Sequence, residues 1–145
     1  MRVLAQRVKS GAVRIEGKAV AGIGPGLVLF IGVAKGDTEQ AAEKLARKTA
    51  ALRIFADAAG KLNLSLKDIG GEALAVSQFT LYADTSRGNR PGFEPAAPPE
   101  LADKIYEHFV RALKEQGISV QTGVFKAHML VSIENDGPVT LMLEN

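Results

Sequence analysis

The sequence contains no cysteine, and this absence excludes both disulfide bonds and thiolate chemistry. It fits a reducing compartment. Histidine is also scarce: His108 and His128 are the only two, and no cluster of metal-ligating residues surrounds either of them in the sequence. Imidazole and thiolate are the usual zinc ligands, so we expect no protein-bound metal and no cofactor.

Long apolar runs and a strong net charge are missing as well. The longest apolar run, from Gly26 to Ala34, is far shorter than the about 20 residues of a membrane-spanning helix. The first residues, Met1 to Leu4, lead directly into strand-like sequence, so we expect no signal peptide, no membrane partner and a cytoplasmic protein. The net charge of +2 does not indicate a nucleic-acid-binding protein by composition, and we expect no DNA partner.

The remaining composition is typical of a globular protein. Hydrophobic residues make up 46% of the 145 residues and charged residues 23%, which excludes a disordered chain. A chain of this length can bury a core of its own. We therefore expect a single domain over residues 1–145.

Short apolar segments predict a mainly β protein. The segment Leu27–Ile31 has no polar member and predicts a central strand buried on both faces. A turn near Glu16-Gly17-Lys18 predicts a hairpin. The other predicted strands are Val3–Val8, Ala12–Glu16, Lys18–Ile23, Arg53–Ala56, Ala73–Tyr82, Ile118–Phe125, Met129–Glu134 and Val139–Leu143.

Two segments have the periodicity of amphipathic helices. The first ends near Leu52, and we expect Asp37 to cap it, with Gln40 three residues further on. The second begins at Pro99, which suits a first helical turn, and ends at Gly117. Strands and helices together predict an α+β domain with a curved, barrel-like, mainly antiparallel sheet and two amphipathic helices.

The longest irregular segment is Ala83–Pro98. Loops of this length are often functional or disordered. This one combines both signs of charge with Pro91 and Phe93, which favours an ordered lid or binding edge. It also carries Arg87 and Arg90, whose positive charges suit contact with phosphate groups.

Polar side chains are concentrated at Ser77, Gln78 and Thr80, within the predicted strand Ala73–Tyr82. Polar groups on a buried strand need partners. Either the backbone of a neighbouring loop supplies those partners, or the three side chains line a pocket. The pattern of this segment alone favours the loop.

Thr80 is a candidate nucleophile, but a threonine hydroxyl needs an activating base. His108 adjoins Phe109 on a predicted helix, and His128 starts a predicted strand, so neither histidine is marked as that base. Most threonines in strands serve packing. From the residues alone, packing is therefore the default role of Thr80.

The Gly137-Pro138 step is a second candidate. Such a step after Asn-Asp usually forms a turn. X-Pro bonds are, however, the only peptide bonds that readily become cis, and a glycine lets the backbone approach an opposing group closely. The dipeptide would then present bare carbonyl groups with no side chain in front of them.

Two segments, Ser77-Gln78-Phe79-Thr80-Leu81 and Asn135-Asp136-Gly137-Pro138-Val139-Thr140, closely resemble the signature motifs of the D-aminoacyl-tRNA deacylase (D-tyrosyl-tRNA deacylase) family. The resemblance spans essentially the whole chain. It includes Gln6-Arg7-Val8, Arg87-Gly88-Asn89-Arg90-Pro91 and Gln121-Thr122-Gly123-Val124-Phe125. Two positions depart from the family pattern: Gly92 stands where a serine is more usual, and Lys126 where a small residue is common.

The resemblance implies a homodimeric enzyme that hydrolyses the ester between a D-amino acid and the terminal ribose of tRNA. One wall of its pocket would be formed by Ser77, Gln78, Phe79 and Thr80, and Met129 would also bind substrate. Gly137-Pro138, with a cis bond, would enter the pocket of the other subunit. Its carbonyl groups would exclude an L side chain and admit glycine, so glycyl-tRNA mischarged on alanine tRNA is a further expected substrate.

The resemblance also implies a substrate-assisted mechanism. Backbone N–H groups near Phe79 and Thr80 would stabilise the oxyanion, and the ribose 2′-hydroxyl would help to activate the attack. Arg87 and Arg90 are the expected tRNA contacts. Two alternatives stay open: a hydrolase of small D-amino esters or peptides that uses Thr80 as nucleophile, and a non-catalytic module that binds charged tRNA or D-amino acids.

Overall fold

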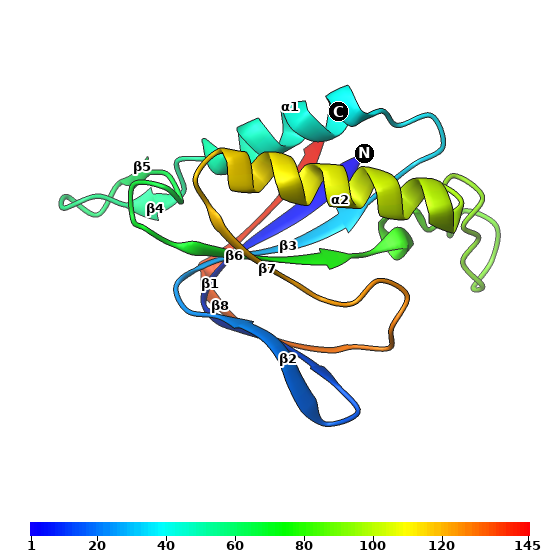
Figure 1. Cartoon of the computed structure of the whole chain (residues 1–145), viewed down its shortest axis with the longest axis horizontal. Coiled ribbons are helices and arrows are strands. Elements are labelled where there is room, and N and C mark those ends of the chain that lie inside the picture. Colours follow the sequence, from blue (N-terminus) through cyan, green and yellow to red (C-terminus); the bar gives the residue numbers. More distant parts are fainter.

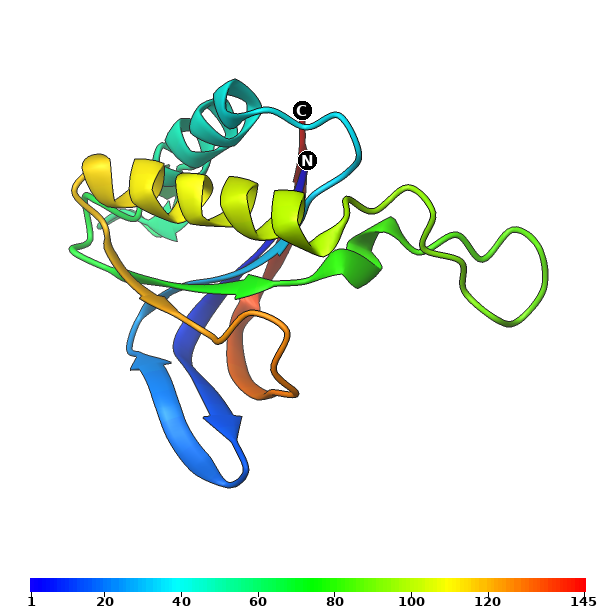
Figure 2. The same cartoon turned by 45° about the vertical axis from the view of Figure 1, so that its right-hand side comes forward.

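Six strands form one strongly curved sheet in the computed structural model, which describes residues 1–145, and two helices cover one face of it (Figures 1 and 2). The strand order is β2-β1-β3-β6-β7, and β8 pairs with the other edge of β1. These strands are β1 (Arg2–Ile15), β2 (Lys18–Ile23), β3 (Gly26–Gly32), β6 (Glu72–Ser77), β7 (Ser119–Thr122) and β8 (Leu130–Glu144).

The curvature comes from β1, which changes partners along its length. Its first half pairs with β3, and from Gly11 onward it pairs with β2, while β8 follows the opposite edge throughout. A Cβ atom at Gly11 would lie 2.6 Å from Cγ2 of Val28. Only a glycine lets the bent strand approach β3 this closely.

The helices α1 (Glu39–Ala50) and α2 (Pro99–Glu115) lie side by side on the sheet (Figure 1). The main core lies between them and the sheet; its largest fully buried side chains include Phe109, Leu45, Leu29 and Leu113. A smaller cluster fills the inside of the curve on the other face and contains Val13, Val28, Leu74 and Val76. Neither helix is long and apolar enough to cross a membrane.

Two smaller elements lie outside this sheet. The strands β4 (Phe55–Ala56) and β5 (Leu62–Leu64) form a short two-stranded arm beside α1 (Figure 1). A 3-10 helix, Phe79–Tyr82, follows β6 directly.

The expected fold class is confirmed: an α+β domain with a curved, barrel-like, mainly antiparallel sheet and two amphipathic helices. The hairpin at Glu16-Gly17, the buried strand around Leu27–Ile31 and the helix start at Pro99 are also confirmed. Two pairings, β3 with β6 and β6 with β7, are parallel. This parallel part of the sheet holds the site described below.

Other boundaries differ from the sequence prediction. The two segments predicted around Ala12 are one strand, β1, and the two around Asn135–Pro138 are one strand, β8. The prediction that Asp37 caps α1 is wrong. The hydroxyl of Thr38 accepts the Ala41 N–H at 3.2 Å, while the Asp37 carboxylate accepts the N–H of Ala34 at 2.7 Å. The cap therefore lies one residue later.

Candidate functional site

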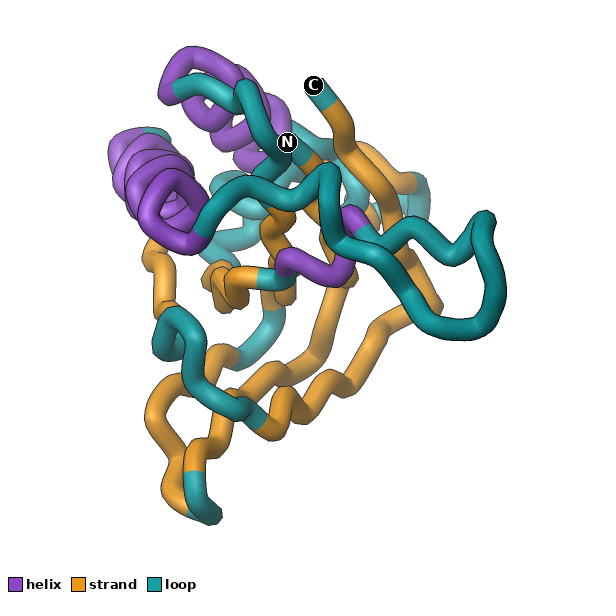
Figure 3. Tube along the Cα trace, turned by 90° about the vertical axis from the view of Figure 1, so that its right-hand side faces the viewer, coloured by secondary structure: helices purple, strands orange, loops and turns teal.

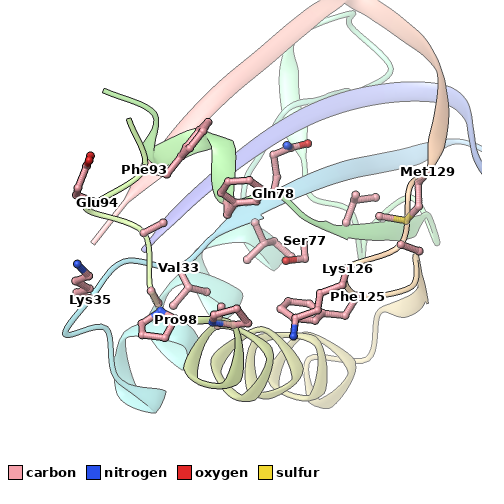
Figure 4. Close-up of a pocket in the computed structure, with 18 residues that line it drawn as sticks. Val33, Lys35, Ser77, Gln78, Phe93, Glu94, Pro98, Phe125, Lys126 and Met129 are labelled. Carbon is pink, nitrogen blue, oxygen red and sulfur yellow. The ribbon is translucent and has the colours of Figure 1, made fainter. Parts of the chain in front are cut away.

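A cavity of about 810 Å³ opens where the parallel strands β3 and β6 end. Its 18 lining residues come from these strand ends and the residues just after β3, the 3-10 helix, the loop segment 93–98, the first turn of α2 and the segment between β7 and β8 (Figure 4). Eleven of them are hydrophobic. Ligand sites of open α/β sheets lie at the same place, because the carboxyl ends of parallel strands meet at one edge.

The polar wall of the cavity is formed where β6 stops. The prediction of a strand through Tyr82 is wrong, because the strand ends at Ser77 and the chain turns at Gln78 into the 3-10 helix. The Gln78 N–H still donates to Ile31 O at 2.8 Å. Beyond it the helix folds over Gly32, where a Cβ atom would lie 3.1 Å from both Gln78 O and Leu81 Cβ.

The turn leaves two backbone N–H groups without an acceptor in the 3-10 helix or in the neighbouring loops. Within this segment Gln78 N, Leu81 N and Ala83 N donate to carbonyl groups, whereas the amides of Phe79 and Thr80 do not. The first amides of a helical turn have no partner inside it. They are adjacent in the chain, and the residue that carries the first of them lines the cavity. The wall can therefore offer a pair of donors to a ligand oxygen.

The Thr80 side chain points to a structural role. Its hydroxyl accepts a hydrogen bond from the Gln78 side-chain amide, and Thr80 is not among the residues that line the cavity. Neither histidine is among the hydrogen-bond partners of this hydroxyl. His108 lies between the two helices, with Nε2 2.9 Å from a carboxylate oxygen of Glu43. The hydroxyl has no base among its hydrogen-bond partners.

Tyr82, at the end of the same 3-10 helix, is also unsuited to act as a base. Partial burial of its phenol, with the negative charge of Asp37 nearby, raises its pKa to about 12. The Arg2 guanidinium lies 4.6 Å from the centre of the ring. The phenol therefore stays protonated near neutral pH.

The loop Ala83–Pro98 is fastened to the cavity at its base and projects from the body of the protein (Figures 2 and 3). Asp84 and Gly92 exchange two backbone hydrogen bonds of 2.8 Å. The Phe93 ring then packs edge to face against Phe79, with 4.9 Å between the ring centres. Arg87 and Arg90 lie in the projecting part, both exposed.

The Gly137-Pro138 step has a cis peptide bond and forms a bulge in β8. Gln6 pairs with Thr140 and Val8 with Asn135, so four residues of β8 lie opposite Arg7 alone. Gly137 has a φ of +122°, a left-handed conformation that strongly favours glycine.

Arg7 and Asn135 hold this bulge in position. The Arg7 guanidinium donates to Asp136 O at 3.1 Å and to Ile54 O at 2.6 Å, and its side chain is 13% exposed. The Asn135 amide donates to Arg7 O at 3.0 Å and to Val139 O at 3.3 Å. A Cβ atom on Gly137 would lie 2.7 Å from the guanidinium. The step is thus fixed in place while its outer side stays exposed.

The bulge and the cavity of the same chain are far apart. Arg7 pairs with Leu27, at the start of β3, whereas the cavity begins at Ile31, four residues along that strand. At about 3.3 Å per residue, the two places are roughly 13 Å apart along the direction of β3. Neither Gly137 nor Pro138 lines it.

Comparison with known proteins identifies the family. A family model described as D-Tyr-tRNA(Tyr) deacylase matches residues 4–144. The chain belongs to this family. It is 53% identical to the D-aminoacyl-tRNA deacylase of Carboxydothermus hydrogenoformans, over 99% of both chains. It is 54% identical to the D-aminoacyl-tRNA deacylase of Thermotoga petrophila, over 100% of this chain and 97% of the relative.

Solved structures agree with this deacylase fold. A structure titled c-Myc DNA Unwinding Element Binding Protein superposes with a TM-score of 0.93 and 38% identity, over 100% of this chain and 99% of the other. A probable eukaryotic D-amino acid tRNA deacylase superposes with a TM-score of 0.85, over 98% and 97% of the two chains. At 17% identity, the second match supports the fold alone.

The site residues predicted for this deacylase from its sequence fall into three places. Ser77, Gln78, Phe79 and Met129 line the cavity, and Thr80 lies beside it. Gly137 and Pro138 lie at the distant bulge, and Arg87 and Arg90 on the projecting loop. Phe93 also lines the cavity, from the loop that was predicted to be a lid or binding edge. Phe125 and Lys126 line it too, although no site role was predicted for either of them. Phe125 and Lys126 follow β7 in the chain, and β7 runs parallel to β6. Residues that follow these two strands therefore lie at the same edge of the sheet, but the sequence alone does not show that the strands are parallel.

Proposed function

We propose that the protein hydrolyses the ester bond between a D-amino acid and the terminal ribose of tRNA, releasing the free amino acid and tRNA. The observation that carries this proposal is the match, over essentially its whole length, to relatives named D-aminoacyl-tRNA deacylase at 53% and 54% identity. The protein is thus a hydrolase that proofreads the chirality of charged tRNA, and it acts in the cytoplasm, where its substrate is used.

The two free backbone amides suggest how the wall promotes hydrolysis. Attack on the ester carbonyl makes its oxygen an oxyanion, which the N–H groups of Phe79 and Thr80 can stabilise at the cavity. The ribose 3′-oxygen then leaves. Because Thr80 is bound to Gln78 and no base lies beside it, the attacking water is activated by the 2′-hydroxyl of the same ribose.

Discrimination between D- and L-amino acids comes from Gly137-Pro138 of a second copy of the chain. The bulge is exposed, is held rigidly by Arg7 and is too far from its own cavity to act there. In a symmetric homodimer each bulge enters the partner's cavity. Its bare carbonyl groups face the substrate α-carbon and collide with an L side chain. A D side chain points away, and glycine has none, so glycyl-tRNA is a substrate too.

An apolar row on the sheet face opposite the helices supports this homodimer. Leu4 is the register partner of Phe30 on one side and of Met142 on the other, so the three side chains lie across adjacent strands. Leu4 and Phe30 are only half-buried, and Met142 is 47% exposed. A second copy would remove this row from water.

The activity is tested by incubating the protein with D-tyrosyl-tRNA, L-tyrosyl-tRNA and glycyl-tRNA and following the free amino acid. We expect rapid release from the D and glycyl forms and none above background from the L form. A hydrolase of small D-amino esters would cleave D-tyrosine methyl ester equally well, and a binding module would retain charged tRNA without turnover. Either outcome, or rapid loss of the L form, contradicts the proposal.

Replacement of Thr80 by alanine is expected to leave most of the deacylation of D-tyrosyl-tRNA intact. The change removes the hydroxyl and its bond to Gln78 but keeps the backbone amide. A loss of one exposed hydrogen bond costs about 1 kcal/mol, so kcat should fall no more than about fivefold. Single-turnover kinetics check this. Complete loss of hydrolysis in a variant that folds and binds charged tRNA normally would restore Thr80 as the nucleophile.

Replacing both Arg87 and Arg90 with alanine is expected to lower the affinity for tRNA and to make that affinity less dependent on salt. Both side chains are exposed on the projecting loop. Each phosphate contact contributes about 0.7 to 0.9 to the slope of log Kd against log salt, so the slope should fall by about 1.5. The control is the Lys44→Ala, Lys48→Ala double variant, which removes the same charge from an exposed part of α1. Equal effects of both double variants would show a general charge effect instead.

A further inference from the structure

The 3-10 helix Phe79–Tyr82 is attached to the rest of the protein at both of its ends. At its start, the Gln78 N–H donates to Ile31 O at 2.8 Å. At its end, Nη1 of Arg2 donates to Leu81 O at 2.7 Å. A helix of four residues has little stability of its own, so its position depends on these attachments.

Arg2 makes two further contacts at this end of the helix. Its guanidinium lies 4.6 Å from the centre of the Tyr82 ring, and its Nε is 2.6 Å from a carboxylate oxygen of Glu144. Arg2 and Glu144 are register partners on the neighbouring strands β1 and β8. A guanidinium can make all three contacts together, because its donors form a rigid planar fork whose face stacks on aromatic rings. Arg2 therefore ties the last two residues of the helix to the sheet.

The position of Leu81 O also determines the direction of the free amides at the other end of the helix. The peptide groups of a helix are aligned, with their N–H groups directed toward its start and their carbonyl groups toward its end. Arg2 binds a carbonyl group at the end, whereas the free amides of Phe79 and Thr80 are at the start, where Phe79 lines the cavity. A tilt of this short helix at Leu81 would turn both N–H groups.

We infer that Arg2 is a positioning residue, which aligns the N–H groups of Phe79 and Thr80 with the oxyanion that forms during hydrolysis. The inference rests on the proposed deacylase function. Arg2 does not line the cavity, so it acts on the reaction through the helix. Because the oxyanion exists only in the transition state, Arg2 should contribute to kcat and leave KM unchanged.

The test measures kcat and KM of Arg2 variants with D-tyrosyl-tRNA. Removal of one oxyanion donor typically lowers kcat about 100- to 1,000-fold, so a tilt that weakens both donors without removing either should lower kcat of Arg2→Met about tenfold. Arg2→Lys keeps a cation that can bind a carbonyl group but lacks the planar fork, so it should recover part of this loss. The Arg2–Glu144 pair is exposed to water, so Glu144→Gln should lower kcat only about twofold.

Arg53→Met is the matched control. Nε of Arg53 donates to Asn63 O at 2.8 Å beside the two-stranded arm, and Arg53 does not line the cavity. Arg53→Met thus also loses a bond from an arginine to a backbone carbonyl group, but its kcat should be normal. Equal kcat values of Arg2→Met and Arg53→Met would overturn the inference, and so would a change of Arg2→Met in KM alone.

The measurements are made over a range of enzyme concentrations. Arg2 and Glu144 are two residues from Leu4 and Met142, on the same face of the sheet, and thus border the apolar row proposed for the homodimer. A fall in kcat of Arg2→Met that disappears at high enzyme concentration would overturn the inference, because it would indicate weaker dimerisation. Absence of hydrolysis by the wild type would overturn the proposed function itself.

Discussion

An alanine at Gly137 is expected to lower kcat/KM for D-tyrosyl-tRNA about 100-fold, because a displacement of about 1 Å in a catalytic arrangement has effects of this size. The new Cβ atom would lie 2.7 Å from the Arg7 guanidinium and 3.0 Å from Cγ2 of Val139, in a left-handed backbone conformation. The bulge must move, and with it the carbonyl groups that we propose face the substrate. Steady-state deacylation measures the effect.

Gly60→Ala separates this effect from the general cost of replacing a left-handed glycine. Gly60 has a φ of +78°, and no atom lies within 4 Å of the position that its Cβ would occupy. It lies in the turn between β4 and β5, away from the cavity. Gly60→Ala should lose some thermal stability but keep its activity, whereas Gly137→Ala should lose both. Equal activities of the two variants would show that Gly137 does not contribute to the site.

Removal of the terminal 2′-hydroxyl from the substrate should have a comparable effect. Acid–base assistance typically contributes about 10²- to 10⁴-fold, so D-tyrosyl-tRNA ending in 2′-deoxyadenosine should be hydrolysed at least about 100-fold more slowly in single-turnover experiments. The enzyme offers no substitute, because Thr80 bonds to Gln78 and the Tyr82 phenol, with its raised pKa, stays protonated.

The control substrate lacks the 2′-hydroxyl of the penultimate nucleotide instead. It should be hydrolysed at the normal rate, since that hydroxyl is not adjacent to the ester. Undiminished turnover of the terminal 2′-deoxy substrate would contradict substrate assistance. A protein group would then have to activate the water.

The elements that follow from burial could be predicted from the sequence. The wholly apolar segment around Leu29 formed a central strand, and the apolar stripes that contain Leu45 and Phe109 placed both helices on the sheet. The predictions failed where two neighbouring residues, or two local structures, are equally favourable by sequence. Asp37 and Thr38 are both good helix caps, and the tertiary bond from Ala34 N to the Asp37 carboxylate decided between them.

The end of β6 was mispredicted for a similar reason. Thr80 and Tyr82 favour a strand and continue the alternation, so no local feature of the sequence indicates the turn at Gln78. The turn is imposed by the tertiary structure, because β3 ends at Gly32 and leaves no strand for further residues of β6 to pair with. The consequence is functional, since the turn frees the amides of Phe79 and Thr80.

The rest of the cavity depends on contacts that the sequence does not reveal. Phe125 and Lys126 lie far from Ser77 along the chain and reach the same cavity because β6 and β7 run in parallel. Phe93 reaches it because the pairing of Asp84 with Gly92 closes the base of its loop. The separation between the cavity and Gly137 is also a property of strand register alone. A site shared by two subunits explains that separation better than a rearrangement within one chain, because Arg7 holds the bulge firmly.

Subunit mixing tests this shared site most directly. Gly137→Ala damages the bulge, and Ala127→Trp fills the cavity, which Ala127 lines from a half-buried position. In a mixed dimer one site combines the intact cavity of the first variant with the intact bulge of the second. When equal amounts of the two variants mix at random, half of the dimers contain one copy of each. Each mixed dimer has one intact site of two, so the mixture should recover about a quarter of the wild-type deacylation of D-tyrosyl-tRNA. A mixture no more active than the mean of the two separate variants would contradict a site built from two subunits.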